Sequence, residues 1–206
     1  MKILGIDEAG RGAVLGPLVV AGAYIEEKQI KILKRMGVKD SKRLTPNRRK
    51  VLSRKLKKIT SYEIIPITAK DIDTLRQRNV NLNEIEKMGI HNIITKINPE
   101  KIIIDSLDVK PERLREEIKI TVNDNVEVIS EHKADDHYIS VASASILAKV
   151  ERDLAIEKLQ KEYRDYGDIG SGYPSDPRTK EFLSNFTYDT MPECVRRSWA
   201  TIENMR

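Results

Sequence analysis

The first dozen residues carry side chains that could perform chemistry together. Two adjacent carboxylates, Asp7 and Glu8, follow the apolar run Ile3–Ile6 and precede the turn Gly10-Arg11-Gly12. Two such charges repel each other, and their burial at a sheet rim is costly unless a cation compensates. A divalent metal bound by oxygen atoms compensates better than Arg11 alone. Because glycines let a ligand approach the backbone and Arg11 could bind a phosphate, the stretch indicates a metal-and-phosphate site. The alternative is a strand that ends in a charged surface turn.

Further acidic residues occur in similar settings. Asp105 ends the isoleucine-rich run that begins at Lys101, and Asp135 and Asp136 begin a long helical segment. One of this pair could be a helix cap and the other a metal ligand, and the residues alone do not decide which. With a single cysteine, Cys194, and no ligand spacing among the three histidines, carboxylates favour one or two Mg²⁺ or Mn²⁺ ions. Two ions about 4 Å apart can activate water and stabilise the leaving oxygen in phosphodiester cleavage.

These side chains need a sheet that brings strand ends together, and the chain contains the elements for one. Apolar runs predict strands over residues 3–6, 15–25, 61–68, 101–105 and 126–131. Helical patterns cover residues 26–36, 45–59, 69–78, a helix capped by Asn83, 111–118 and 137–163, with a last helical part that contains 195–199. Because open α/β sheets place ligands at strand ends, an α/β fold could gather the carboxylates.

The composition bounds the class of protein. The 206 residues are 39% hydrophobic, which is enough for one large domain or a domain with a small appendage. No run has membrane-spanning length and the N-terminus has no signal-peptide pattern, so we expect no membrane association. A lone cysteine fits a reducing compartment, and we expect a cytoplasmic protein.

The basic residues are unevenly distributed. The formal net charge is +5, and the segment from Lys28 to Lys58 is densely basic. A polyanion such as nucleic acid is the natural partner for this segment, although a solvated surface typical of thermophiles would look similar.

Six motifs in order resemble one family. They are Asp7–Gly12, Asp40–Lys42, Ile104-Asp105, Lys133–Asp135, Ala142–Lys149 and Gly170–Asp176. Together they resemble type 2 ribonuclease H (ribonuclease HII), and the arrangement is most similar to the archaeal members. Because the motifs extend from residue 7 to residue 176, the resemblance covers most of the chain.

The resemblance implies a fold and an activity. It implies an α/β, ribonuclease H-like mixed five-stranded sheet flanked by helices, with a helical C-terminal extension. We expect a catalytic domain over residues 1–165 and a helical part over 166–206 packed on it. The implied activity is endonucleolytic cleavage of RNA in RNA–DNA hybrids, and incision 5′ to a ribonucleotide embedded in duplex DNA. The products would carry a 3′-hydroxyl and a 5′-phosphate.

The resemblance also implies roles for particular residues. Asp7, Glu8, Asp105 and Asp135 match the catalytic metal ligands, so it favours Asp135 over Asp136, and two Mn²⁺ or Mg²⁺ ions are expected with substrate bound. The element that reads the ribose 2′-hydroxyl matches Gly10, Arg11 and Gly12, and the tyrosine that stacks on the following sugar matches Tyr173. Candidate phosphate contacts are Lys42, Lys149 and Arg196.

The expected partners are an RNA–DNA hybrid and ribonucleotide-containing duplex DNA, bound by a monomer. No C-terminal aromatic pair of the kind that docks on a sliding clamp precedes Arg206, which puts clamp binding in doubt. A junction resolvase of related fold is a rival, but the Gly-Arg-Gly and Gly-Tyr-Pro elements suit 2′-hydroxyl recognition. A non-catalytic hybrid-binding protein would be expected to have lost a carboxylate, and all four are present.

Overall fold

The computed structural model describes residues 1–106 and 110–206. The side chains of residues 40–42 lie outside the described part, and with them the predicted phosphate contact of Lys42. The chain forms two compact units that interleave along the sequence. The first comprises residues 1–9, 20–65 and 86–150, and the second comprises residues 10–19, 66–85 and 151–206. The division at residue 165 stays a prediction.

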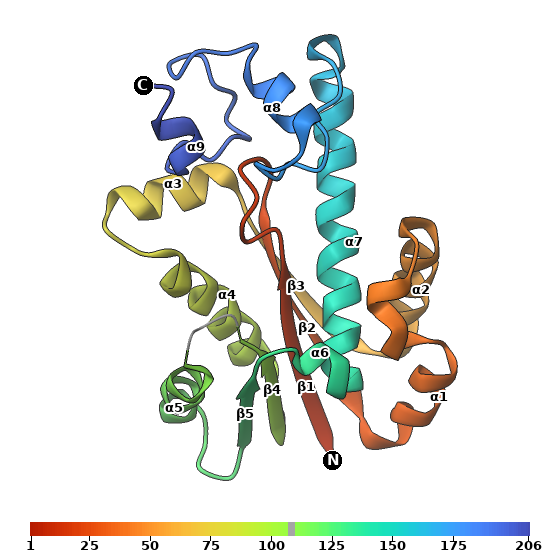
Figure 1. The fold of residues 1–206 in the computed structure, drawn as a ribbon. Coiled ribbons are helices and arrows are strands. Elements are labelled where there is room, and N and C mark those ends of the chain that lie inside the picture. Colours follow the sequence, from red (N-terminus) through yellow and green to blue (C-terminus); the bar gives the residue numbers. More distant parts are fainter. Residues whose placement is uncertain (107–109) are drawn as a thin grey trace. The chain divides into compact units, whose positions relative to one another are not determined.

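The five predicted strands form one sheet in the order β3-β2-β1-β4-β5 (Figure 1). Their bounds are β1 Lys2–Ala9, β2 Leu18–Glu26, β3 Ser61–Ile67, β4 Lys101–Asp105 and β5 Glu127–Glu131. The strands β1, β4 and β5 are parallel neighbours, with Ile6 opposite Ile104. Pro66 lies in β3, at the edge of the sheet, where a residue that cannot donate a backbone hydrogen bond is tolerated. The second strand begins at Leu18 and not at Leu15.

The predicted helix over 137–163 begins two residues later than expected, and a separate short helix precedes it. Helix α6 spans Ala134–His137 and α7 spans Ile139–Glu162, with Tyr138 extended between them. The small residues at the start of α7 pack closely on the sheet, as their size predicts. A Cβ atom on Gly5 of β1 would lie 2.2 Å from the carbonyl carbon of Ser140, so a side chain at position 5 would push this helix away.

The first unit also contains α1 Ile30–Arg35, α2 Pro46–Ile59 and α5 Pro111–Thr121, with 3-10 helices η1 Glu27–Gln29 and η2 Val38–Arg43. Thr45 caps α2, since its hydroxyl accepts from the Arg48 amide at 3.3 Å. Figure 1 shows α5 beside β5, where the two elements pack. Helix α4 spans Leu82–Lys96. Its predicted cap, Asn83, is wrong, because Asn81 and Glu84 exchange two bonds of 3.0 Å and form a capping box.

The second unit contains α3 Ala69–Gln77, η3 Arg164–Tyr166, α8 Pro177–Leu183 and α9 Ala200–Glu203. Residues 195–199, predicted as helical, are not. Val195 instead forms a β-bridge with Leu15, and the Arg196 amide donates to the Val14 carbonyl at 2.8 Å. These backbone groups are therefore engaged with a distant loop and cannot form helical bonds. Within the described residues, the helices are all too short or too polar to cross a bilayer.

Candidate active site

Three carboxylates converge in the first unit. Asp7 near the end of β1, Asp105 at the end of β4 and Asp135 in α6 each offer an oxygen, and these atoms all lie within 4.8 Å of one another. The parallel register explains the first two, because Asp7 and Asp105 follow the paired Ile6 and Ile104. The contact of α6 with β4 adds Asp135. The structure thus brings together the strand ends that the sequence analysis expected to meet.

The electrostatics of this group fit a divalent cation. Burial, above all, and then the charge of Asp105 raise the pKa of Asp7 to about 7, although a hydrogen bond from Ser145 opposes the shift. Burial and the neighbouring Asp135 raise the pKa of Asp105 to about 6. Ionisation of these buried, neighbouring carboxyl groups is unfavourable without a cation. A hard metal ion bound among them would favour their charged form. Asp7, Asp105 and Asp135 can therefore hold the Mg²⁺ or Mn²⁺ ion that the sequence predicts.

A serine and a lysine on α7 support Asp7. The Lys149 ammonium donates to the Ser145 hydroxyl at 2.7 Å, and Ser145 in turn forms a hydrogen bond with Asp7. The Lys149 charge also lowers the pKa of Asp7, against the larger effect of burial. Lys149 therefore lies beside the carboxylate group, and its predicted phosphate contact stays a prediction. The sequence analysis did not single out Ser145, although it lies within the motif Ala142–Lys149.

Glu8 and Asp136 lie outside the group of three. The sequence left Asp135 and Asp136 as alternatives, and the structure places Asp135 with the other two carboxylates. The role of Glu8 as a metal ligand stays a prediction.

In the second unit, a buried arginine holds the Gly10-Arg11-Gly12 loop. Arg196 has no exposed surface, and its guanidinium donates to the carbonyls of Gly16 at 3.0 Å, Arg11 at 2.9 Å and Gly10 at 2.7 Å. Burial lowers the pKa of Arg196 to about 9. Each nitrogen of Arg196 thus donates to a carbonyl inside the protein, and its predicted phosphate contact stays a prediction. Arg196 holds the loop in place.

A second buried arginine touches this loop and the one that carries Tyr173. The Arg152 guanidinium lies 4.7 Å from the centre of the Tyr173 ring and donates to the Ser171 carbonyl at 2.8 Å. A Cβ atom on Gly10, which has a φ of +82°, would lie 2.4 Å from Arg152 Nε. That nitrogen is buried without a hydrogen-bond partner among the described residues. Sequence analysis missed Arg152, since a basic residue in the middle of a helix gives no signal of such a contact.

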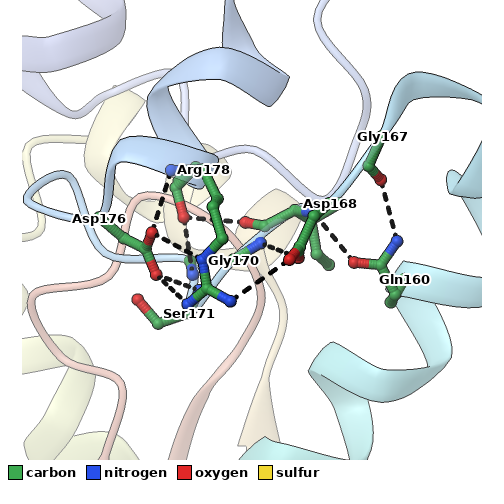
Figure 2. A network of polar contacts seen from close by, with 10 residues as sticks. Gln160, Gly167, Asp168, Gly170, Ser171, Asp176 and Arg178 are labelled. Atoms are coloured by element: carbon green, nitrogen blue, oxygen red, sulfur yellow. Dashed lines mark hydrogen bonds and ion pairs between the residues drawn. The ribbon is translucent and has the colours of Figure 1, made fainter.

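The Gly-rich loop that carries Tyr173 is fixed by its own polar network (Figure 2). Asp176 accepts from the amide of Ser171 at 2.8 Å, and Asp168 accepts from the amide of Gly170 at 2.8 Å. Arg178 bridges the two carboxylates, at 2.9 Å from Asp176 and 3.3 Å from Asp168. Hydrogen bonds, first from Arg178 and then from Ser171, hold the pKa of Asp176 well below its ordinary value. Tyr173 therefore belongs to a loop that hydrogen bonds and ion pairs hold in place.

Arg11 and Gly12 border a cavity in the same unit. The Arg11 guanidinium donates to the side chain of Asn83, at the start of α4. The cavity measures about 330 Å³, and Trp199 and Arg76 also line it. Gly12 is exposed, and a Cβ atom there would meet nothing within 4 Å. The loop thus offers an exposed glycine backbone beside an oriented guanidinium.

Known proteins are similar to this chain in sequence and in fold. The sequence profile of the family Ribonuclease HII matches residues 4–202. The chain belongs to the ribonuclease HII family. Ribonuclease HII from Methanothermobacter thermautotrophicus is 60% identical over 206 residues, which cover all of both chains. The crystal structure of ribonuclease H2 from Pyrococcus horikoshii, at 46% identity, superposes with a TM-score of 0.90 and covers 100% of this chain and 97% of that one.

A ribonuclease HII from Archaeoglobus fulgidus, solved as a complex with PCNA, is 43% identical. It has a TM-score of 0.87 and covers 97% of this chain and 95% of that one. Family membership confirms the ribonuclease H-like fold and the archaeal resemblance, and it makes the chain a metal-dependent nuclease that acts on RNA–DNA hybrids. The expectation that this chain does not bind a sliding clamp stays a prediction.

Metal binding should strengthen as pH rises, because the carboxyl groups that would hold the ion must be deprotonated. Asp7 and Asp105 have raised pKa values in the folded protein, so the fold is more stable while both are neutral. The free energy of unfolding therefore falls as pH rises through 6 and 7 and the two groups ionise. A metal binds the deprotonated forms and restores that stability. We expect Mn²⁺ to raise the melting temperature of this ribonuclease HII more at pH 8 than at pH 5. An equal rise at both pH values would contradict this.

Proposed function

We propose that the chain cleaves RNA strands of hybrids and also incises 5′ to single ribonucleotides in duplex DNA, with two divalent ions, giving 3′-hydroxyl and 5′-phosphate ends. The ligands would be Asp7, Glu8, Asp105 and Asp135. The observation that carries the proposal is the convergence of three carboxylate oxygens within 4.8 Å at the ends of two parallel strands and a short helix. Bound there, Mg²⁺ or Mn²⁺ would supply an activated water and stabilise the leaving oxygen.

The protein's own groups prepare this site. Ser145 holds Asp7 in position and Lys149 adds a positive charge beside it, which helps Asp7 to ionise. Glu8, which follows Asp7 near the end of β1, would complete the set of ligands for a second ion. Lys149 would contact a substrate phosphate, for which an ammonium is a suitable partner.

The second unit supports recognition of a ribose. Arg196 fixes the carbonyls of Gly10 and Arg11, so the loop is rigid before substrate binds. An exposed Gly12 leaves its backbone open to a 2′-hydroxyl, which can donate and accept a hydrogen bond. Tyr173, held against Arg152, would stack on the next sugar.

The two glycines of the loop provide the test. Gly12→Ala meets no atom of the protein, so we expect an unchanged melting temperature but at least about a tenfold loss of incision at a single ribonucleotide, because the methyl group obstructs the ribose. Gly10→Ala is the control for structural damage. Its Cβ would lie 2.4 Å from Arg152 Nε and 2.7 Å from the Pro17 carbonyl, so we expect a lower melting temperature.

Both variants should be compared with wild type on a duplex with one ribonucleotide and on an all-DNA duplex. Wild-type activity by Gly12→Ala on the ribonucleotide substrate would refute the role of the loop. Cleavage of the all-DNA duplex by wild type would favour a resolvase-like nuclease, and binding without cleavage would favour a hybrid-binding protein.

A further inference from the structure

Helix α2, Pro46–Ile59, is strongly basic and has no acidic residue. The chain has 37 Lys and Arg against 32 Asp and Glu, and seven of the basic residues but none of the acidic ones lie in α2. The rest of the chain therefore has 30 basic and 32 acidic residues, a formal charge of −2. Helix α2 is therefore a strong source of attraction for a polyanion, within the basic segment from Lys28 to Lys58.

The basic side chains of α2 form an outward face. Leu52, Ser53 and Leu56 are buried on the opposite side. Arg48, Arg54, Lys55 and Lys58 are exposed, and helical spacing puts them on one side around Val51, which is 49% exposed. Across the described residues, no carboxylate forms an ion pair with any of these four cations, whereas the exposed basic residues Arg113 and Arg115 of α5 each pair with a glutamate.

In the first unit, the 3-10 helix that precedes α2 links it to the helix that carries Asp135. The 3-10 helix η2 ends at Arg43, three residues before α2 begins, and it packs against α6, which carries Asp135. A nucleic acid with a phosphate at the carboxylates would therefore have its backbone near the start of α2. The N-terminal end of the helix dipole adds further positive potential there.

We propose that the outward face of α2, formed by Arg48, Arg54, Lys55 and Lys58, is a docking surface for the phosphate backbone of the duplex outside the cleaved nucleotide. This inference rests on the proposed function, since it assigns a further contact to the same substrate. Each phosphate neutralised by a side chain releases counterions, so the contact has a measurable salt dependence. It reads no sequence, because phosphate contacts position a duplex without distinguishing its bases.

The test compares two triple variants with the same change in charge and composition. Arg48→Gln, Arg54→Gln and Lys58→Gln together neutralise three cations on α2, and Arg113→Gln, Arg115→Gln and Lys119→Gln do so on α5. Glutamine is a good helix former, so both helices should persist, which circular dichroism would verify. Binding of an RNA–DNA hybrid is measured in the Asp7→Asn background, where no cleavage interferes, over a series of salt concentrations.

For the α2 variant we expect the slope of log K against log salt to fall in magnitude by about 2 to 3, and binding near 0.1 M salt to weaken at least tenfold. The α5 variant should change the slope by less than about 1. Equal changes in both variants, or none in either, would overturn the docking surface. Because binding is measured without cleavage, failure of the proposed incision at ribonucleotides would be seen separately, in the wild-type activity assay.

Discussion

Asp7→Asn should abolish cleavage and at the same time make the metal-free protein more stable. Asparagine keeps the acceptor for Ser145 and Glu8 but removes the charge that burial penalises. At pH 8 we expect a melting temperature a few degrees above that of the wild type without metal, since functional carboxylates cost stability. Cleavage should fall by at least about 10³-fold, because loss of a metal ligand removes several kcal/mol of transition-state stabilisation.

The matched control is Asp136→Asn. Asp136 adjoins Asp135 but lies outside the group of three carboxylates, so this variant should keep activity close to that of the wild type. Mn²⁺ should stabilise Asp136→Asn and fail to stabilise Asp7→Asn in thermal melts. If Asp7→Asn retained wild-type cleavage, or if Asp136→Asn lost it, the assignment of the metal ligands would be wrong.

Arg196 is expected to give the largest loss of stability. Arg196→Met would leave the carbonyls of Gly16 and Arg11 without the donors they have now, and Gly10 with only a 3.3 Å bond from Ala13. A buried carbonyl left without a donor typically costs about 1–3 kcal/mol in the free energy of unfolding, so the loss of these bonds corresponds to a fall in melting temperature on the order of 10 °C. Arg196→Lys should not rescue it, because an ammonium cannot reproduce the fork of the guanidinium.

Thermal unfolding of Arg196→Met, Arg196→Lys and Arg164→Lys would measure this. Arg164 is 80% exposed, and its conservative substitution should change the free energy of unfolding by less than about 0.5 kcal/mol. An Arg196→Met protein with wild-type stability but weakened hybrid binding would favour the predicted phosphate contact.

The sequence predicted the strands and the meeting of carboxylates at their ends well, because both follow from local patterns. An isoleucine-rich run that ends in aspartate, as at residues 102–105, predicts a buried strand with a carboxylate at its end, and the structure has this strand. Once β1 and β4 are parallel neighbours, Asp7 and Asp105 must lie close together. The choice of Asp135 needed the position of α6, which the residues alone did not give.

The contacts that the sequence could not predict join distant residues through backbone carbonyls. Arg196 and Gly10 are 186 positions apart, and a carbonyl acceptor is present at every residue, so no pattern of side chains identifies the pair. The same holds for Arg152 and the Ser171 carbonyl. Asn83 was predicted as a cap because asparagine is common there, but its side chain instead accepts from Arg11.

The most direct test of the metal centre and of ribose recognition uses a labelled DNA duplex with one embedded ribonucleotide beside an all-DNA duplex. The protein is assayed with Mg²⁺, with Mn²⁺ and with EDTA, and the ends of the products are analysed. We predict metal-dependent incision 5′ to the ribonucleotide, with 3′-hydroxyl and 5′-phosphate ends and no cut in the all-DNA duplex. Incision that persists in EDTA, or equal cleavage of both duplexes, would contradict the account.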